Sequence, residues 1–557
     1  MRHRCREWLV ARAQCRAARP GRRPGARVIL IYPQPSRSAP LWLGMALYPA
    51  RDSVSRAGVF LTDSMIRFSR RLHARCTLAE MPTLLSLCAA AVAVAAMLAG
   101  CSLTRTDYER PALPVPAQFG TPLDGAHSTT DNAPLRDDNT IDPWWQAFRD
   151  PQLDTLVRQA LATNPGLALK ALQADRDALQ AGLTGANRWP QFSGTVTGAK
   201  SRALDGGQAA LAYSGQTQTM SGASIGISYE IDLWHKLAAQ RDAAQWQAAA
   251  SAWDRRAAAL SLSSQVASLY WRVAYLNENV RSAAEDLTAA ERTVALVDAR
   301  RRAGAVSAID AVQAQQDRDA LAGTLAEWER LRDTARHSLA NALGLPAQTR
   351  FAESATLAPA HLPDIAPGLP ASLLAQRPDL AAAETRVRAR LADVDAARLS
   401  FYPSITLNGA ATTGSDSLSR LLANPVGTLA ATLTMPFLQV QTARFTTALA
   451  RNDYEQAVAT FRSTLLTALT EVEDALSARE RTSVQYASLA SAATLAQRAA
   501  DLSSARYRAG DIDLQSWLDA QRLARQARRN TAQSRLGQID ATLSLVKALG
   551  GTLGTDD

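Results

Sequence analysis

The 557-residue chain carries 61 basic and 51 acidic residues, which gives a net charge of +10. The first 80 residues hold 16 Arg and 4 acidic residues, a net charge of +12, so the rest of the chain has 10 − 12 = −2. A nearly neutral body argues against nucleic-acid binding. The five Cys lie at or before residue 101, which excludes an intrachain disulfide or a Cys-based zinc site in the chain beyond that residue.

Residues 1–64 mix Arg, Pro and Trp without any periodicity. The basic residues of the whole chain are nearly all Arg and Ala is abundant, which indicates a GC-rich genome. Reading frames in such genomes often extend upstream of the true start. We therefore interpret residues 1–64 as a non-native N-terminal extension, with Met65 or Met81 as the start; a genuine extension is the alternative.

Residues 65–100 have the order of a secretory signal peptide, with four Arg between 67 and 75 before an uncharged apolar run over 84–100. The run has 17 residues, fewer than the about 20 that a spanning helix needs. It ends at Gly100-Cys101, in a pattern that resembles the lipobox of bacterial lipoproteins. We expect Cys101 to be the lipidated N-terminus, and Ser102 after it implies sorting to the outer membrane. An uncleaved anchor with an incidental Cys is the alternative.

Residues 101–143 contain six Pro and few large apolar residues, which predicts an extended, lipidated tether. The first repeat, residues 144–345, begins with Trp144-Trp145. Asp150-Pro151 and Asn164-Pro165 mark the starts of two helices, the second of which ends near Asn187.

After Pro190 the apolar residues recur with a period of two. Alternation runs over 192–198 and, after a loop rich in Gly, Ser and Gln, strictly over 224–233. One apolar face and one polar face fit a hairpin on a soluble core. They fit equally a hairpin of a membrane β-barrel, and the alternation alone does not separate the two.

Long helices follow these strands. Apolar residues from Leu262 to Val297 step by four and three, which is an a/d heptad seam. The helix that carries the seam is expected over about 236–301, and at 1.5 Å per residue it would be about 100 Å long. The turn at Gly304 ends it, and an antiparallel helix returns to Leu343.

The chain then repeats this unit. Arg302-Ala303-Gly304 returns as Arg508-Ala509-Gly510, an offset of 508 − 302 = 206. A Pro-rich linker over 346–370 leads into the second repeat, residues 371–550, and residues 551–557 are a tail. In this repeat we expect a helix over about 371–399, strands around 404–407 and 428–437, a long helix over about 441–506 and a return helix to Leu549.

Four strands of this kind cannot close a barrel, and open sheet edges in lipid leave backbone groups unsatisfied. If the strands span a membrane, the protein must oligomerise; two copies give eight strands and three give twelve, and the pattern does not choose between them. The polar helices would project as a coiled-coil tube. The expected fold is therefore an α+β membrane protein with an internal repeat, in which an outer-membrane β-barrel continues as a periplasmic α-helical barrel.

Several motifs match one known family. They are Trp144-Trp145 with Asp150-Pro151-Gln152-Leu153, Asn164-Pro165, Tyr229-Glu230-Ile231-Asp232-Leu233-Trp234, Arg377-Pro378-Asp379-Leu380 and Phe401-Tyr402-Pro403-Ser404-Ile405. With them, the chain from Trp144 to Gly550 resembles the TolC-like outer-membrane efflux channels, in their lipoprotein branch. The resemblance implies a homotrimer with a twelve-stranded barrel, docked to a periplasmic membrane-fusion adaptor and an inner-membrane RND-type pump. It implies a passive exit duct for drugs and other small molecules.

The resemblance also places the Gly304 and Gly510 turns at the periplasmic tips, where the channel narrows and meets its adaptor. It implies that Asp519 belongs to a ring of Asp residues at the closed entrance, whereas Ser516 stands where some members have another Asp. The alternative for Asp519 is a solvated surface residue.

Three further residues are implied to belong to this entrance. Asp310 and Tyr507 match positions that tie neighbouring helix pairs together in closed channels, and Arg508 lies beside them. At the offset of 206, Ser516 replaces Asp310 and Asp519 replaces Gln313. We therefore expect the second turn to form the gate and the first turn to brace it.

No catalytic set is apparent in the sequence. Four His, at 127, 235, 337 and 361, lack ligand spacing, and the chain has no phosphate loop, nucleophile elbow or HExxH motif. The sequence therefore predicts no enzyme, no cofactor and no metal site. Two other functions stay open, a channel for type I protein secretion and a periplasmic coiled-coil scaffold lipoprotein whose strands pair on a soluble core.

Overall fold

The computed structural model describes residues 105–111, 143–202, 217–357, 360–363, 365 and 377–552. The predicted extension, the signal peptide and Cys101 lie outside the described residues, as do most of the tether and most of the tail. None of the helices in the described part is both long and apolar enough to cross a membrane.

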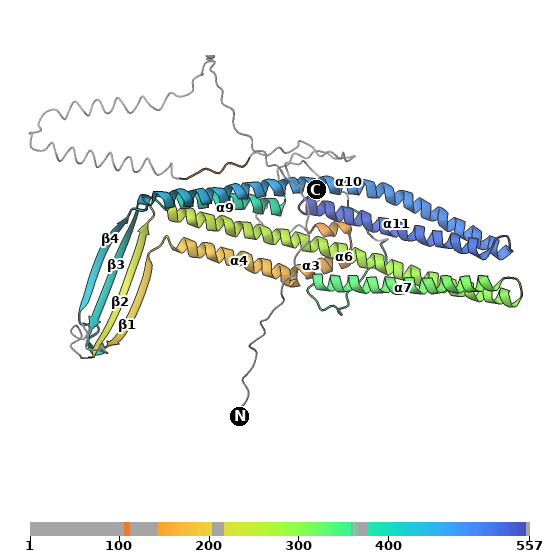
Figure 1. The fold of residues 1–557 in the computed structure, drawn as a ribbon, viewed down its shortest axis with the longest axis horizontal. Coiled ribbons are helices and arrows are strands. Elements are labelled where there is room, and N and C mark those ends of the chain that lie inside the picture. Colours follow the sequence, from red (N-terminus) through yellow and green to blue (C-terminus); the bar gives the residue numbers. More distant parts are fainter. Residues whose placement is uncertain are drawn as a thin grey trace, which may run out of the picture. The chain divides into compact units, whose positions relative to one another are not determined.

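The two repeats share one order of main elements: a helix, two strands, a long helix and a return helix (Figure 1). The first repeat adds a 3₁₀ turn and a helix at its start, and the second adds two 3₁₀ turns beside its strands. The first comprises η1 (Trp144–Phe148), α3 (Pro151–Thr163), α4 (Pro165–Ala186), β1 (Gln191–Ser201), β2 (Gln218–Ile231), α6 (Lys236–Arg302) and α7 (Ala308–Ala342). The second comprises α9 (Pro378–Leu399), β3 (Ser404–Ser415), η2 (Leu418–Arg420), β4 (Pro425–Thr434), η3 (Pro436–Leu438), α10 (Val440–Ala509) and α11 (Leu514–Ala548).

The predicted element types are confirmed, but several strand boundaries were wrong. β2 ends at Ile231 and not at Leu233, and β3 continues to Ser415, beyond the predicted end near Leu407. The alternation in the second repeat predicted a strand as far as Phe437, but β4 ends at Thr434 and a 3₁₀ turn follows. Pro436 explains the end of the strand, because proline has no N–H to donate to the ladder. The predicted start of α9 near Ala371 lies outside the described residues.

The two hairpins join into one antiparallel sheet with the strand order β1-β2-β3-β4. The pairing of β2 with β3, which joins the repeats, places Ile227 opposite Gly409. The Ser228 hydroxyl donates to Asn408 Oδ1 at 2.8 Å across the same strand pair. In the single chain β1 and β4 are the edge strands, and every residue of both is exposed.

The long helices carry the predicted seam. Val266, Val273 and Val297 of α6 are fully buried. In Figure 1 the sheet lies at one end of α6 and α10, and the turns that follow these two helices lie at the other end. The helices form two antiparallel pairs, α6 with α7 and α10 with α11.

The largest core cluster forms where η1 and α3 pack on α6. Trp144 contacts Trp145 edge to face at 5.9 Å, and Phe148 lies 6.5 Å from Trp271. Asp150 caps α3 by accepting from the Gln152 amide at 2.8 Å, and its second carboxylate oxygen accepts from the Tyr270 hydroxyl at 2.7 Å. Burial and this carboxylate raise the pKa of Tyr270 well above its usual value.

The Arg377-Pro378-Asp379 motif joins three helices. Arg377 is buried; it donates to both carboxylate oxygens of Asp379, to Glu471 of α10 at 2.7 Å, and to the Ala548 carbonyl at the end of α11 at 3.0 Å. Burial opposes the charge of Asp379, but the Arg377 guanidinium still holds the pKa of this carboxyl below its usual value. The motif is therefore a connector within the fold.

Four helix ends share one cap. Gly304, Gly344, Gly510 and Gly550 have φ between +72° and +86°. At Gly304 and Gly510 the glycine amide bonds the carbonyl three residues earlier, and the next amide bonds the carbonyl five residues earlier, at 2.9–3.1 Å. This is a Schellman motif, whose left-handed position favours glycine. The turns predicted at Gly304 and Gly510 are therefore confirmed, and each places its glycine in the left-handed region.

Substitution of Gly304 and of Gly344 should lower the stability of the protein by different amounts, because the space around the two glycines differs. Gly304→Ala should lower the free energy of unfolding by about 1–2 kcal/mol, the cost of a left-handed non-glycine residue, because an added Cβ there meets nothing within 4 Å. Gly344→Ala should cost clearly more, since the Cβ would lie 2.7 Å from the Thr163 carbonyl oxygen. Urea unfolding followed by circular dichroism in detergent measures both.

Gly323 provides the control for this comparison. It lies within α7, and an added Cβ there meets nothing within 4 Å. Gly323→Ala should therefore stabilise the protein, by about 0.5–1 kcal/mol. Equal losses at Gly304 and Gly344 would contradict the close approach to Thr163.

Candidate functional site

The two repeated turns share one small core. We call it the tip core: the buried residues Val297, Ala311, Ala314, Tyr507, Leu514, Trp517 and Leu518. They come from α6, α7, α10 and α11, so the ends of both helix pairs pack together. The sequence predicted that the turns lie at the end remote from the strands, and the ribbon has this arrangement (Figure 1).

Tyr507 lies at the centre of the contact between the two turns. Its ring stacks on Trp517 with the centroids 4.7 Å apart. The Arg300 guanidinium lies 4.8 Å from the Tyr507 ring centroid and donates to the backbone carbonyls of Tyr507 and Arg508 at 3.3 and 3.1 Å. The Arg300 guanidinium, at the end of α6 just before the Gly304 turn, therefore binds carbonyls at the end of α10. The helix dipole favours positive charge at this end.

Two buried polar atoms in the tip core have no hydrogen-bond partner in the described part of the chain. They are the Tyr507 hydroxyl and the Trp517 indole nitrogen. Most buried polar groups in native proteins are hydrogen-bonded. The Tyr507 side chain points into the core of its own chain, whereas Arg508 is exposed.

Asp310 belongs to the cap of its own helix. Ser307 accepts from the Asp310 amide, and the Asp310 carboxylate accepts from the Ser307 amide and hydroxyl, both at 2.8 Å. In the second repeat the two residue types change places. Asp513 is the N-cap of α11, and its carboxylate accepts from the Ser516 amide at 2.7 Å. These hydrogen bonds hold the pKa of Asp513 below its usual value. The substitution of Ser516 for Asp310 thus preserves a capped helix.

Asp519 lies one turn into α11, and its side chain is 45% exposed. It pairs with Arg522 at 2.9 Å and accepts from the Gln515 amide group at 3.0 Å. Surface pairs of this type contribute little to stability. Although Trp517 and Leu518 before it are buried, Asp519 itself stays outside the tip core, open to charges that approach from solvent.

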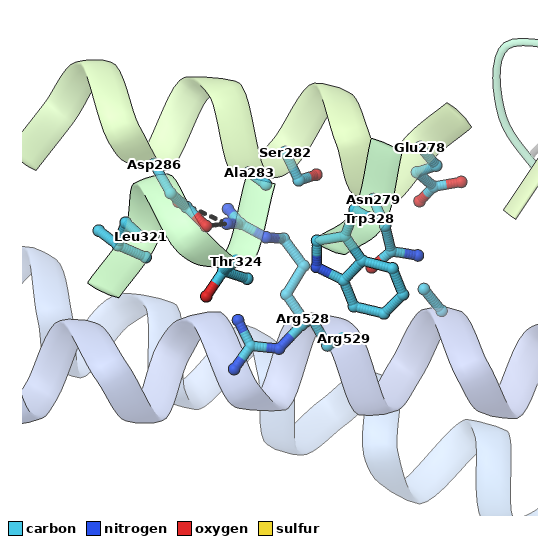
Figure 2. Close-up of a pocket in the computed structure, with 11 residues that line it drawn as sticks. Glu278, Asn279, Ser282, Ala283, Asp286, Leu321, Thr324, Trp328, Arg528 and Arg529 are labelled. Atoms are coloured by element: carbon cyan, nitrogen blue, oxygen red, sulfur yellow. Dashed lines mark hydrogen bonds and ion pairs between the residues drawn. The ribbon is translucent and has the colours of Figure 1, made fainter. Parts of the chain in front are cut away.

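Sequence reasoning missed the ion pairs between the two helix pairs. Arg525 of α11 is buried and pairs with Asp317 of α7 at 3.1 Å. One turn further along α11, Arg528 reaches across to both carboxylate oxygens of Asp286 on α6 at 2.7 Å (Figure 2). The signal was the spacing of Arg residues at 522, 525, 528 and 529, by threes and fours, along one face of the helix.

A small pocket lies beside the Arg528–Asp286 pair and is lined in part by Trp328 (Figure 2). Arg529 also lines it; burial, with the neighbouring cations Arg525 and Arg528, lowers the pKa of its guanidinium. Charge is therefore concentrated where the two helix pairs meet, which makes this contact sensitive to the loss of either carboxylate.

Arg300 should be the residue on which the second turn depends. We expect Arg300→Ala to raise hydrogen exchange of the amides around residues 508–513 by at least about tenfold, because two hydrogen bonds and a cation–π contact are lost. Exchange of the detergent-solubilised protein, measured by mass spectrometry, checks this.

Arg301→Ala is the matched control. Arg301 is the next residue of α6, and its ion pair is to Asp298 of its own helix, at 3.7 Å. The control should leave exchange around 508–513 unchanged. Equal effects of the two substitutions would show that Arg300 does not hold the second turn.

Comparison with known families gives a match over both repeats. The family described as "Outer membrane efflux protein" matches residues 156–345 and 369–551. The chain belongs to this family. The two matched segments coincide closely with the two predicted repeats, 144–345 and 371–550, so the family unit is the duplicated unit itself.

Individual relatives of this efflux protein cover most of its length. Pyoverdine export outer membrane protein OpmQ of Pseudomonas putida is 33% identical over 411 residues, 73% of this chain and 87% of its own. Outer membrane protein OprJ of Pseudomonas aeruginosa is 32% identical over 478 residues, 83% of this chain and 95% of its own. The open-state outer membrane channel MtrE of Neisseria gonorrhoeae matches with a TM-score of 0.69 at 27% identity, covering 81% of this chain and 98% of its own.

These matches bear on the functions that the sequence left open. The protein is an outer-membrane efflux channel with a periplasmic helical extension, and its fold is that of the TolC-like family. The family consists of transport proteins, and this confirms the prediction that the chain is not an enzyme. A periplasmic scaffold whose strands pack on a soluble core is therefore excluded.

Proposed function

We propose that this chain forms a homotrimer in which three sheets close a twelve-stranded barrel. The supporting observation is the pair of open edges, β1 and β4, on a sheet of four strands. The helical layer has the corresponding edges, because α4, α6, α9 and α10 follow one another in space (Figure 1). A head-to-tail contact that joins the α4 and β1 edge of one chain to the α10 and β4 edge of the next closes a ring.

Side chains on these helical edges support the same contact. Leu172 and Leu179 of α4 are 65% and 72% exposed in the single chain, and Phe445 and Leu449 of α10 are 67% and 65% exposed. Each pair stands at a spacing that places its members on one helix face. Large apolar side chains in rows of this kind mark a surface that another chain covers.

The lipoprotein assignment is also a proposal. Its support is the signal-peptide order of residues 65–100 and the lipobox-like end at Cys101. Lipidation with several acyl chains would anchor each protomer stably, in addition to its strands. Incorporation of a clickable fatty acid that disappears in Cys101→Ser is the expected behaviour, and a label that persists in this variant excludes Cys101 as the acceptor.

The function that these features support best is a passive exit duct for drugs and other small molecules. An inner-membrane RND-type pump and a periplasmic membrane-fusion adaptor would pass the molecules on to it. The observation that carries this proposal is the length of α6: its 67 residues span about 100 Å at 1.5 Å per residue. The tips therefore reach far from the sheet, toward partners in the periplasm, and relatives such as OpmQ are named for export.

A deletion strain tests the duct. We expect loss of the gene to make the cells several-fold more susceptible to drugs and dyes, with secreted proteins unchanged, because the duct is the final step of small-molecule export. Minimum inhibitory concentrations and the proteins of the medium are the two measurements.

The unheated purified protein should also migrate as a trimer in SDS gels and as a monomer after boiling. Unchanged susceptibility with loss of a secreted protein would favour the type I secretion alternative. A protein that migrates as a monomer without heating would contradict the closed barrel.

We further propose that the second turn forms the gate and the first turn braces it. Arg300 supports this division, because it holds the carbonyls of Tyr507 and Arg508. The ion pairs of Arg525 and Arg528 support it as well, since they fasten α11 to the first helix pair. In this proposal Asp519 faces the lumen, where threefold symmetry would bring its copies together and attract cations.

The gate proposal predicts a change in selectivity. We expect Asp519→Ala to reduce the preference of the channel for cations, because three lumenal charges are lost. Single-channel recordings in planar bilayers with a salt gradient measure the reversal potential. Asp511→Ala is the control, since Asp511 is an exposed acid of the same turn. Equal reversal potentials for Asp519→Ala and the unsubstituted channel would refute a lumenal Asp519.

A further inference from the structure

Residues 105–111, within the predicted tether, lie against α9 and α6 without regular secondary structure. Thr106 donates through its amide and its hydroxyl to the two carboxylate oxygens of Asp395, both at 2.8 Å and 289 positions away in the chain. Asp395 is only 4% exposed, although it is charged. The two hydrogen bonds therefore fix Thr106 against a buried side chain of α9. A tether that served only as a spacer would not need them.

The next two alternate residues of this segment bind a second buried carboxylate. The Tyr108 hydroxyl donates to Glu384 at 3.2 Å, and Arg110 pairs with the same carboxylate through two nitrogens. Arg388 of α9 completes the group, because it lies 4.6 Å from the Tyr108 ring centroid and donates to Glu384 at 3.1 Å. Glu384 is 8% exposed, so burying it without these donors would be costly.

The electrostatics of Glu384 agree with this geometry. Burial opposes the charge of the carboxyl, but the hydrogen bonds from Arg110 and Arg388 hold its pKa below the usual value. Burial, and the negative charge of Glu384 beside it, raise the pKa of Tyr108 to about 12. Arg105 adds a third attachment, to Asp242 of α6 at 2.8 Å.

The attachments of Thr106 and Arg105, to Asp395 and Asp242, lie near the sheet. Asp395 is close to the end of α9, and Tyr402 follows it by 402 − 395 = 7 residues. Tyr402 contacts Trp234 edge to face at 5.5 Å, and Trp189 before β1 is 73% exposed. Trp and Tyr gather where barrel strands leave the membrane. At 1.5 Å per residue, Thr106 is therefore held on the order of 10 Å from the base of the sheet.

We propose that residues 105–111 are a clamp that holds the lipid-modified N-terminus at the membrane end of the helices. This rests on the proposal that Cys101 is lipidated. Five positions separate Cys101 from Thr106, and an extended chain covers at most about 3.6 Å per residue, roughly 18 Å in all. The lipid anchor therefore reaches the membrane surface at the base of the sheet while the clamp stays closed, and it cannot move far from its own protomer.

Limited proteolysis tests the clamp in the full-length protein in detergent micelles. Trypsin cleaves after Arg105 only when the segment is released, because the Thr106 amide is bound by Asp395. We expect the double variant Tyr108→Phe, Arg110→Met to accelerate this cleavage by at least about tenfold, since all donors from the segment to Glu384 are removed. Mass spectrometry of the new N-terminus at Thr106 gives the rate.

Asp107 and Glu109 provide the control. Both are exposed and alternate with the residues that face α9. Asp107→Asn with Glu109→Gln should leave the cleavage rate within about twofold, because the contacts with the helices stay intact. Asp395→Asn attacks the clamp from the helix side, so the test does not depend on a single variant. Heat-modifiable migration in SDS gels confirms that each variant assembles.

The outcomes of these experiments distinguish a failure of the clamp proposal from a failure of the proposal that Cys101 is lipidated. Cleavage at the unsubstituted rate in both the double variant and Asp395→Asn would overturn the clamp. Absence of a fatty-acid label at Cys101 would overturn the lipid anchor and the role that the clamp has toward it, whatever the cleavage rates. Cys101→Ser should keep the slow cleavage, because the attachments lie within the chain; fast cleavage in this variant would overturn the clamp as a contact of these residues.

Discussion

The unpaired backbone of two edge strands is the constraint on which the rest of the structure depends. β1 and β4 expose their residues over 11 and 10 positions, and each has one side without a partner in the single chain. In lipid, each unsatisfied N–H or C=O group costs several kcal/mol. Neighbouring copies must therefore supply the partners. The exposed leucines of α4 and the exposed apolar residues of α10 continue these edges along the helices, so that one contact serves the sheet and the helical layer together.

Duplication supplies two similar halves that differ at a few residues of their turns. Both turns use the same glycine cap, and both return helices begin with a capped first turn, through Ser307 in one and Asp513 in the other. The asymmetry lies in what crosses between the halves. Arg300 of the first turn binds the end of α10, and Arg525 and Arg528 of α11 bind carboxylates of the first helix pair. Near the tips these charged contacts join the two helix pairs in addition to the apolar packing of the tip core.

The motifs that suggested the family are connectors. Asp150 joins the cap of α3 to Tyr270, and Arg377 joins the start of α9 to the middle of α10 and the end of α11. Both residues satisfy polar groups that burial would otherwise leave without partners.

The sequence by itself determined the elements: strands from a period of two, helices from a heptad seam, and turns from repeated glycines. These patterns can be recognised in the sequence because each depends on hydrogen bonds and burial within a few neighbouring residues. Tertiary structure alone decided the pairing of β2 with β3, the stacking of Tyr507 on Trp517 under Arg300, and the attachment of Thr106 to Asp395. Most of these contacts join residues about 180 to 290 positions apart. No local period records them, because they depend on which helix faces meet once the two repeats pack together.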